Sequence, residues 1–363
     1  MPLEIATQFW PWDSIGNIVN YGRQALKKYP FDQIWMCDEF QYEDCTTILS
    51  SMAMNLDVSL GSMVTFPWRN PLELAQRFAS IAKLARPGKG VAVGIGAGGA
   101  VQVQVIAEKR NPAAVMRESV ELLTGLLSGQ EVELSRFPEL AKRFRYNTKS
   151  KTRLYFPPPR KVPVFLAAGG PRLYEIAGRY ADGVIFSQLV ARTSLLGLRR
   201  GLLRQAVESV EAAREKTEPA RPFKKIYNLH ISVSRDGKQA RQWAKRNASY
   251  GLSGAYIRYP EVLATLGLDP KEVGFVAEAY IKGLGVDEAA KRVSDDLLGR
   301  AGNVVAGTPD ECVETCREIV KHITALGFDQ LVMGVPLGPN IPEAIELIAE
   351  KVLPALNPTT KEG

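Results

Sequence analysis

Histidine and cysteine are scarce in this chain of 363 residues, which contains two histidines and four cysteines. Histidine is the commonest general base near neutral pH and a frequent zinc ligand, so its scarcity argues against zinc hydrolases and most Ser-His-Asp hydrolases. Cys312 and Cys316 lie one helical turn apart, but no second cysteine pair or histidine pair completes a metal site. We therefore expect no metal ion, no disulfide framework, and reduced cysteines that are mostly buried.

Signals for export and for membrane insertion are also absent. The first ten residues, MPLEIATQFW, have neither the basic segment nor the apolar segment of a secretory signal. No apolar run approaches the length that spans a membrane. The net charge is +7, but the positive charge is dispersed, and no aromatic-rich recognition module accompanies it. We expect a cytoplasmic protein with a small-molecule substrate, no nucleic-acid or membrane partner, and a homodimeric or higher homo-oligomeric state.

Short apolar runs alternate with amphipathic helical patterns along the chain. The expected strands span residues 3–9, 31–37, 58–65, 91–95, 162–168, 184–186, 226–233 and 329–334. The expected helices span residues 15–28, 46–56, 72–84, 113–127, 171–180, about 192–216, 238–249, a segment that begins at Thr308, and 342–352. Eight strands that alternate with helices predict the α/β class and a (β/α)8 TIM barrel.

The barrel is expected to form a single domain over residues 1–363 with two insertions. The first, about 130–161, is basic and rich in proline, and the second, about 250–303, is mixed helical material broken by several glycines and prolines. Neither continues the alternation of strands and helices. We interpret both insertions as segments that shape the substrate pocket.

Polar and glycine residues gather at the C-terminal ends of the expected strands, where (β/α)8 barrels place their active sites. These residues are Gln8, Asp38, Glu39, Ser62 to Thr65, Gly96 to Gly99, Gly169, Gly170, Ser187, Gln188, His230, Ser232 and Gly334. The strand ends therefore predict the position of the site.

The junction between the strand at 162–168 and the next helix carries the clearest ligand signal. Pro171 fits the first turn of a helix, but Gly169 and Gly170 offer no side chain to cap that turn. Free N–H groups and the helix dipole favour an anion there, and glycine lets a phosphate approach the backbone. A plain tight turn is the alternative. Other helix starts carry their own caps, namely Asn70, Asn111, the capping box at Thr308, and Asn340.

Residues 94–99, GIGAGG, match the GxGxxG pattern of dinucleotide-binding folds. That fold requires a helix directly after the glycines, whereas residues 100–105, AVQVQV, are rich in β-branched residues. Three strand–helix units also precede the match. A dinucleotide-binding fold is therefore not favoured.

Several stretches together resemble the luciferase-like monooxygenase superfamily over nearly the whole chain. They are Asp38, SMVTFPWRNPLELAQRFASIAKL at 62–84, GIGAGG at 94–99, VFLAAGGPRLYEIAGRYADGVI at 164–185, and GTPDE at 307–311. Within that superfamily, the AAGGP and ADGVI sequence motifs are most similar to those of enzymes that use the deazaflavin coenzyme F420. Examples are methylenetetrahydromethanopterin reductases and F420-dependent glucose-6-phosphate and alcohol dehydrogenases.

The resemblance implies F420 as the cofactor and a bulge in the third strand, often with a non-prolyl cis peptide, placed at Ser62-Met63. It also implies phosphate contacts at the glycine-rich ends of the fourth and fifth strands. With neighbouring strand-end residues, the expected cofactor-binding set is Ser62, Met63, Val64, Thr65, Ala97, Gly98, Ala168, Gly169, Gly170, Arg172 and Ser187. An acidic cofactor tail is expected to meet basic residues, namely Arg192, Arg143, Arg145, Lys149 and Lys151.

The chain departs from the dehydrogenase members after the second strand, where they carry Asp-His and this chain carries Asp38-Glu39. Glutamate can exchange a proton near neutral pH only if burial and the adjacent carboxylate raise its pKa. A reductase, in which a protonated Glu39 donates to the product, is the more natural fit. The expected catalytic residues are Asp38, Glu39 and Gln8. The alternative for Asp38 and Glu39 is a pair of acidic residues in a surface loop without a catalytic role. An FMN-dependent two-component monooxygenase and a non-catalytic flavin-binding barrel remain alternatives.

Overall fold

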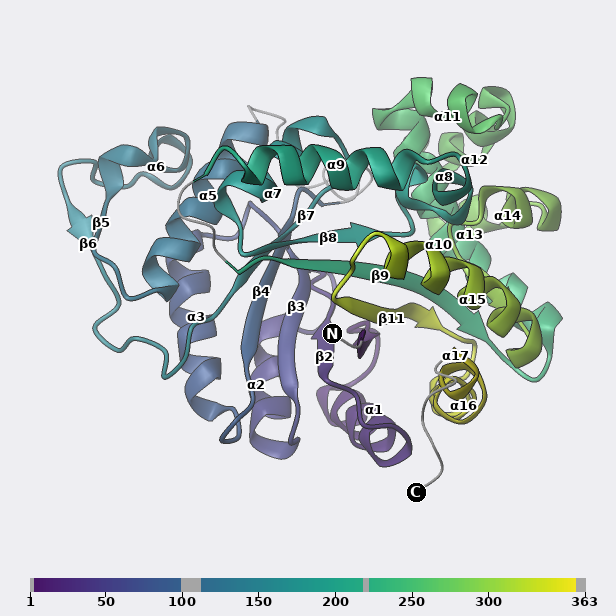
Figure 1. Cartoon of the computed structure of the whole chain (residues 1–363), viewed down its shortest axis with the longest axis horizontal. Helices are drawn as coiled ribbons and strands as arrows, with labels where there is room; N and C mark the ends of the chain where they lie inside the picture. The colour runs from purple at the N-terminus through teal and green to yellow at the C-terminus, as the bar shows by residue number, and fades with distance from the viewer. Residues whose placement is uncertain (1–2, 99–111, 218–221, 357–363) are drawn as a thin grey trace.

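Eight parallel strands close into a barrel in the computed structural model, which describes residues 3–98, 112–217 and 222–356 (Figure 1). They are β1 (Glu4–Phe9), β2 (Gln33–Met36), β3 (Ser59–Thr65), β4 (Val91–Gly96), β7 (Val164–Ala167), β8 (Gly183–Ser187), β9 (Lys224–Val233) and β11 (Gln330–Leu337). The order around the barrel is β9-β11-β1-β2-β3-β4-β7-β8, and β8 pairs with β9 to close it. The predicted (β/α)8 TIM barrel is confirmed.

Helices follow the strands and pack on the outside of the barrel. They are α1 (Ile15–Lys28), α2 (Cys45–Asn55), α3 (Pro71–Leu84), α5 (Pro112–Leu127), α7 (Pro171–Tyr180), α8 (Leu195–Arg199), α9 (Leu202–Arg214), α15 (Pro309–Ala325) and α16 (Ile341–Leu347). The expected final helix at 342–352 is interrupted, since a π-helical turn (Ile348–Val352) follows α16 and leads into α17 (Leu353–Leu356). The caps predicted at Asn70, Thr308 and Asn340 are present, whereas Asn111 lies outside the described residues.

The first insertion lies against the outside of the barrel. It contains β5 (Val132–Glu133), a 3-10 turn (Leu134–Arg136), α6 (Pro138–Phe144) and β6 (Lys151–Thr152). The buried carboxylate of Glu118 on α5 accepts hydrogen bonds from the backbone N–H groups of Glu139 and Leu140, which fixes the start of α6. The Tyr146 hydroxyl donates to Asn70 at the start of α3. The insertion is therefore anchored to α3 and α5.

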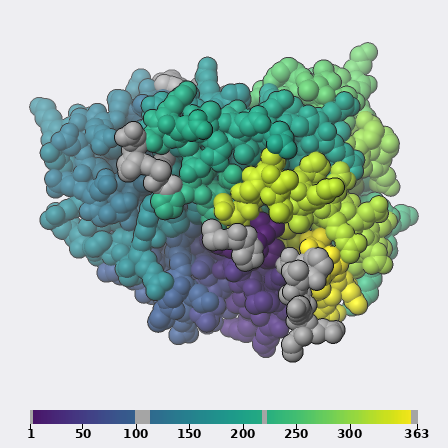
Figure 2. All heavy atoms as spheres, in the orientation of Figure 1, coloured from purple at the N-terminus to yellow at the C-terminus, as the bar shows by residue number. Residues whose placement is uncertain are grey.

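The second insertion forms a helical lobe on the opposite side of the molecule from the first, shown in light green in Figures 1 and 2. It comprises α10 (Gly237–Arg258), α11 (Pro260–Leu266), α12 (Pro270–Ile281), α13 (Gly285–Lys291) and α14 (Asp295–Ala301). All of these helices except α13 contribute to an apolar core that is separate from that of the barrel. The prediction ended α10 at residue 249, which is wrong. Gly251 lets the helix pass the Leu189 carbonyl, which a Cβ atom would approach to 2.6 Å. The short strand β10 (Val305–Gly307), paired with β9, was not predicted.

The interior of the barrel is filled by side chains. Each of the eight strands contributes one residue to a central cluster, namely Ala6, Trp35, Met63, Ala92, Phe165, Ile185, Ile226 and Val332. The indole of Trp35 is fully buried, and its N–H donates to Gln330. Gly61 leaves room for that indole, since a Cβ atom there would lie 2.4 Å from it. Because the interior is packed, a ligand can bind only at the barrel mouth.

All four cysteines are unpaired and buried, as predicted. Among the described residues, no group of three or more His, Cys, Asp or Glu side chains is arranged to hold a metal ion. Within the same residues, no helix combines the length and the apolar character that a membrane span requires.

Candidate functional site

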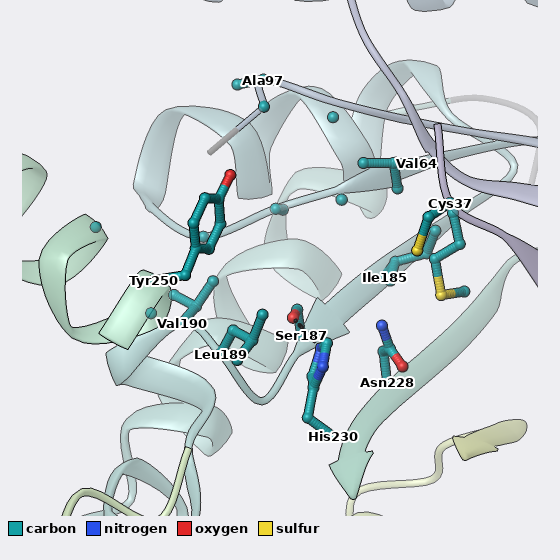
Figure 3. Close-up of a pocket in the computed structure, with 18 of the residues that line it drawn as sticks. Cys37, Val64, Ala97, Ile185, Ser187, Leu189, Val190, Asn228, His230 and Tyr250 are labelled. Atoms are coloured by element: carbon teal, nitrogen blue, oxygen red, sulfur yellow. Dashed lines mark hydrogen bonds between the residues drawn. The ribbon is translucent and has the colours of Figure 1, made fainter. Parts of the chain in front are cut away.

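A cavity of about 240 Å³ opens at the C-terminal ends of the strands. One water molecule needs roughly 10–15 Å³ by this kind of measure, so the cavity can hold an organic ligand. The expected site residues that line it are Gln8, Asp38, Glu39, Met63, Val64, Ala97, Gly98, Ala168, Gly169 and Ser187. Residues of α10 and its end form a further wall, and Figure 3 shows Tyr250 on this side of the cavity.

Four expected site residues do not line the cavity. The Ser62 hydroxyl donates to the Gly94 carbonyl and accepts from the Gly94 N–H, so it ties β3 to β4. The Thr65 hydroxyl donates to Asp38. Gly170 is the N-cap residue of α7, and Arg172 is exposed in the first turn of that helix.

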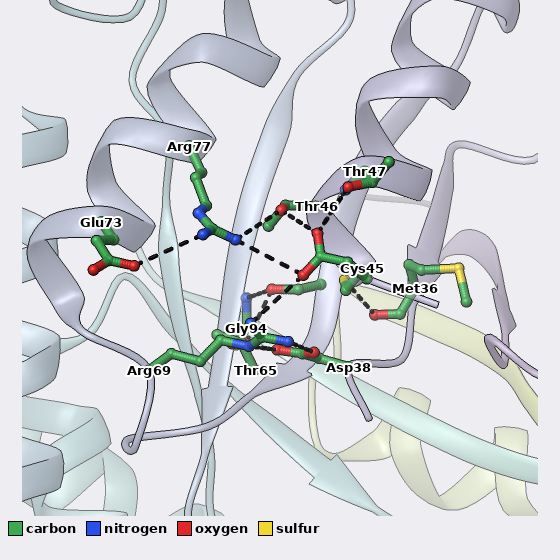
Figure 4. A network of polar contacts seen from close by, with 12 residues as sticks. Met36, Asp38, Cys45, Thr46, Thr47, Thr65, Arg69, Glu73, Arg77 and Gly94 are labelled. Atoms are coloured by element: carbon green, nitrogen blue, oxygen red, sulfur yellow. Dashed lines mark hydrogen bonds and ion pairs between the residues drawn. The ribbon is translucent and has the colours of Figure 1, made fainter. Parts of the chain in front are cut away.

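The Asp38 carboxylate forms a two-point ion pair with Arg69 (Figure 4). Arg69 Nη2 lies 2.6 Å from Asp38 Oδ1, and Arg69 Nε and Thr65 Oγ1 each lie 2.7 Å from Oδ2. Such a bidentate pair fixes the position of the carboxylate. Asp38 is therefore held in place with both of its oxygen atoms already engaged.

Glu39 lies next to this ion pair and lines the cavity with its buried side chain. Burial and then the charge of Asp38 raise the pKa of Glu39 to about 8. No donor among the described residues satisfies its carboxyl group in the way that Arg69 satisfies Asp38. Glu39 is therefore mostly protonated at pH 7 and can donate a proton to a bound molecule.

Gln8 joins five strands at the mouth of the barrel. Its Nε2 donates to the Met63 carbonyl at 2.6 Å and to Cys37 Sγ at 3.1 Å, and its Oε1 accepts from Asn228 Nδ2 at 3.1 Å and from the Val335 N–H at 3.4 Å. With all these contacts made, Gln8 positions the strand ends around the cavity.

The bulge predicted in β3 is present, because the register with β4 shifts between Ser62 and Thr65. The cis peptide was predicted at Ser62-Met63, which is wrong by one bond, since it joins Met63 to Val64. The bulge turns the side chains of Met63 and Val64 into the cavity wall. A local backbone irregularity of this kind has no signature in the sequence that fixes it to a single bond.

His230 and Ser187 form a buried pair on the cavity wall (Figure 3). His230 Nδ1 lies 2.6 Å from the Val335 carbonyl oxygen, which can only accept, so the proton lies on Nδ1. The other ring nitrogen, Nε2, then accepts from Ser187 Oγ at 3.0 Å. Burial lowers the pKa of His230 to about 4, so the ring is neutral at pH 7. The Ser187 oxygen therefore offers its lone pairs to an N–H group of a ligand.

The start of α7, beside the cavity, is suited to an anion. As predicted, no side chain caps α7 at Gly170. The Tyr259 hydroxyl would lie 3.1 Å from a Cβ atom at Gly170, and the Arg192 guanidinium lies 5.8 Å from the Tyr259 ring centroid. Arg192 Nε and the Tyr174 hydroxyl are buried and have no partner within the described structure. These donors and the free helix start fit a phosphate group.

Arg258, the last residue of α10, adds a second cation to this region. Its Nη2 donates to the carbonyl of Gly98 at 2.8 Å, and both residues line the cavity. Gly98 has a positive φ of 75°, a conformation that glycine adopts without strain. The contact holds the end of β4 against the helical lobe.

The basic segment of the first insertion does not reach this cavity. None of Arg143, Arg145, Lys149 and Lys151 lines it, and Lys151 forms an ion pair with Glu133 at 2.7 Å. Of the residues expected to meet a cofactor tail, only Arg192 lies beside the start of α7.

Sequence reasoning missed several residues of the site. Arg69 and Tyr250 were not singled out, and His230 was noted at a strand end without a role. Arg258 could not be placed, because the prediction ended its helix before that residue. The only sequence signal for Arg69 is its position directly after the polar end of β3.

The geometry agrees with comparisons to known proteins. A family model described as luciferase-like monooxygenase matches residues 6–328, and the chain belongs to this family. A 5,10-methylenetetrahydromethanopterin reductase from Archaeoglobus fulgidus is 27% identical over 333 residues, which cover 90% of this chain and 92% of that protein. An F420-dependent glucose-6-phosphate dehydrogenase from Nakamurella multipartita is 28% identical over 356 residues, which cover 93% of this chain and 92% of that protein.

A solved structure of the coenzyme F420 dependent tetrahydromethanopterin reductase from Methanopyrus kandleri superposes with a TM-score of 0.75 at 22% identity. The match covers 98% of this chain and 100% of that one. At this identity the likeness shows the fold, which is the one predicted.

Proposed function

We propose that the protein is an F420-dependent oxidoreductase that acts as a reductase on a small organic substrate. The observation that carries the proposal is the combination of two features at the barrel mouth. A buried neutral carboxylic acid, Glu39, lines the cavity, and an uncapped helix start with unpartnered donors lies beside that cavity. The names of the relatives support F420 as the cofactor.

The residues present fit such a cofactor. The phosphate would be held by the start of α7 with Arg192 and Arg258, and an N–H group of the ring system would meet the lone pairs of Ser187. The apolar wall formed by Met63, Val64 and Ile185 would cover the ring. When bound in its reduced form, F420 supplies the hydride.

Glu39 is the residue to which we assign the proton. Protonated at neutral pH, it donates to the substrate atom that gains negative charge as the neighbouring atom is reduced. Burial and then the charge of Asp38 keep the pKa of Glu39 high, and Arg69 and Thr65 hold Asp38 in place. Gln8 positions the strand ends. Asp38 and Gln8 therefore act as positioning residues in this proposal.

A screen of candidate acceptors with reduced F420 tests the proposal. Reoxidation of F420 is followed by its visible absorbance in wild-type protein and in the Glu39→Gln variant. We expect oxygen-independent reoxidation with a reducible substrate, and much slower reoxidation in the variant. Oxygen consumption with reduced FMN, accompanied by an oxygenated product, would instead identify a two-component monooxygenase.

A further inference from the structure

A second cavity, of about 450 Å³, adjoins the first. Trp10, Glu39, Leu189 and Tyr250 line both cavities, so they form a shared wall. A molecule in the second cavity would therefore meet the carboxyl of Glu39 while the first cavity holds another ligand. This arrangement gives the second cavity the position of a substrate site.

Aromatic side chains dominate the lining of the second cavity. They are Trp10, Trp12, Tyr42, Tyr250 and Tyr280. The ring centroids of Trp10 and Trp12 are 4.8 Å apart, and those of Tyr250 and Tyr280 are 6.4 Å apart with their planes nearly perpendicular. Trp12 is 39% exposed and Tyr42 is 48% exposed, although large aromatic side chains are usually well buried. Exposed aromatic faces beside a cavity suit the stacking of a flat ring.

The charges in the second cavity cancel one another. Its charged lining residues are Glu39, Arg246 and Asp287. Arg246 Nη2 lies 2.6 Å from Asp287 Oδ1, and the guanidinium also lies 4.5 Å from the ring centroid of Trp243. Since Arg246 is paired with Asp287, the lining offers no cation that lacks a partner. A phosphorylated substrate would have no counter-charge there.

One polar group in the shared wall has no partner. The indole N–H of Trp10 is buried and donates to no atom in the described parts of the chain. A buried donor is normally paired, so a ligand atom that accepts a hydrogen bond would complete this wall. The carboxyl of Glu39 lies in the same wall.

We propose that the substrate is a flat aromatic or heteroaromatic molecule without a phosphate group, bound in the second cavity with an acceptor atom facing the Trp10 N–H. This inference rests on the proposed function and deepens it. In the reaction, one π bond of a conjugated C=N or C=C group is lost. One of its atoms gains a C–H bond with the electron pair of the hydride, and the other gains the proton of Glu39. Reduced F420 would be the reductant: it would lose the hydride to the substrate and its ring N–H proton to solvent, and solvent would return a proton to Glu39.

Calorimetric titration with three probes tests the substrate class. Quinoxaline is flat and heteroaromatic, 1-decalone is a bicyclic ketone that accepts hydrogen bonds but is not flat, and glucose 6-phosphate is phosphorylated. We expect quinoxaline to bind at least tenfold more tightly than either of the others. Equal or tighter binding of 1-decalone or glucose 6-phosphate would overturn the inference.

Variants locate the binding site. Trp12→Ala and Tyr42→Ala, each of which changes only the second cavity, should weaken quinoxaline binding at least fivefold. Tyr155→Ala removes an aromatic side chain that is 87% exposed and lies outside both cavities, and it should change nothing. Unchanged quinoxaline affinity in both cavity variants would overturn the inference.

Titration of F420 into the same samples separates the two proposals. F420 affinity should stay unchanged in Trp12→Ala and Tyr42→Ala, since neither residue lines the first cavity. Failure of wild-type protein to bind F420 would overturn the proposed function, even if quinoxaline bound. Normal F420 binding with no preference for quinoxaline would overturn the substrate class alone.

Discussion

Arg69 donates a hydrogen bond to each carboxylate oxygen of Asp38, from Nη2 to Oδ1 at 2.6 Å and from Nε to Oδ2 at 2.7 Å. This ion pair holds the carboxylate of Asp38 in place next to Glu39. Asp38 was expected to share the acid–base role with Glu39. The oxygen atoms of Asp38 are engaged by Arg69 and Thr65, whereas the side chain of Glu39 lines the cavity, so we assign the proton to Glu39 alone.

Replacing Glu39 by Gln should lower turnover about 100-fold or more, the usual contribution of a positioned proton donor. The affinity for F420 should change little, because the substitution removes a proton and leaves the phosphate site intact. Steady-state turnover and a separate cofactor titration distinguish these effects. Turnover that survives the substitution would show that Glu39 is not the donor.

Activity should fall as the pH rises through about 8, because Glu39 must be protonated to donate. Asp38→Asn removes a charge that raises this pKa, so the fall should move to lower pH. The shift should be partial, since burial is the larger cause and remains. A pH–rate profile of both proteins checks this, and identical profiles would contradict the assigned role of Asp38.

Glu39 should also make the stability of the protein depend on pH. Its pKa is 4.5 when unfolded and about 8 when folded, so the stabilising contribution of the protonated form is complete below 4.5 and is lost as the pH rises through 8. Each pKa unit corresponds to about 1.4 kcal/mol. The unfolding free energy of Glu39→Gln minus that of wild type should therefore be a few kcal/mol larger at pH 9 than at pH 6. Urea unfolding at both pH values measures the change, and an equal difference at the two would rule it out.

Ser187 and His230 should act as one unit in cofactor binding. His230→Phe frees the Ser187 hydroxyl to turn its proton toward the cavity, and Ser187→Ala removes the oxygen, so each change should weaken F420 binding several-fold. The double variant should be little worse than either single one, because the two changes remove the same contact. Additive losses in F420 titrations would show that the residues act independently.

The regular elements could be predicted because their signals are local. The range of α1, Ile15–Lys28, was predicted to the residue, since its apolar spacing is regular and Ser14 caps it. The end of α10 could not be predicted, because glycines such as Gly251 and Gly254 usually indicate the end of a helix. The reason for Gly251, its close contact with the Leu189 carbonyl, is visible only in the structure. The three residues of β10 are too few to show a pattern.

For the site, the strand ends and the uncapped start of α7 could be predicted from the sequence, because they depend on spacing along the chain. Contacts between residues that are far apart in the sequence could not be predicted, because only the fold brings them together. Arg69 stands 31 residues after Asp38, and His230 stands 43 residues after Ser187. That the oxygen atoms of Asp38 are engaged follows only from the distant contact with Arg69. The aromatic lining of the second cavity also combines residues from distant parts of the chain.

In the proposed complex, F420 occupies the first cavity with its phosphate at the start of α7. A titration of wild type, Gly170→Val and the control Gly16→Val with F420 and with FMN tests this placement. A valine at Gly170 would press on Tyr259, whereas Gly16 lies in the first turn of α1 with nothing within 4 Å of its Cβ position. We predict that wild type and Gly16→Val bind F420 more tightly than FMN and that Gly170→Val loses F420 binding. Preference for FMN, or full F420 affinity in Gly170→Val, would contradict the account.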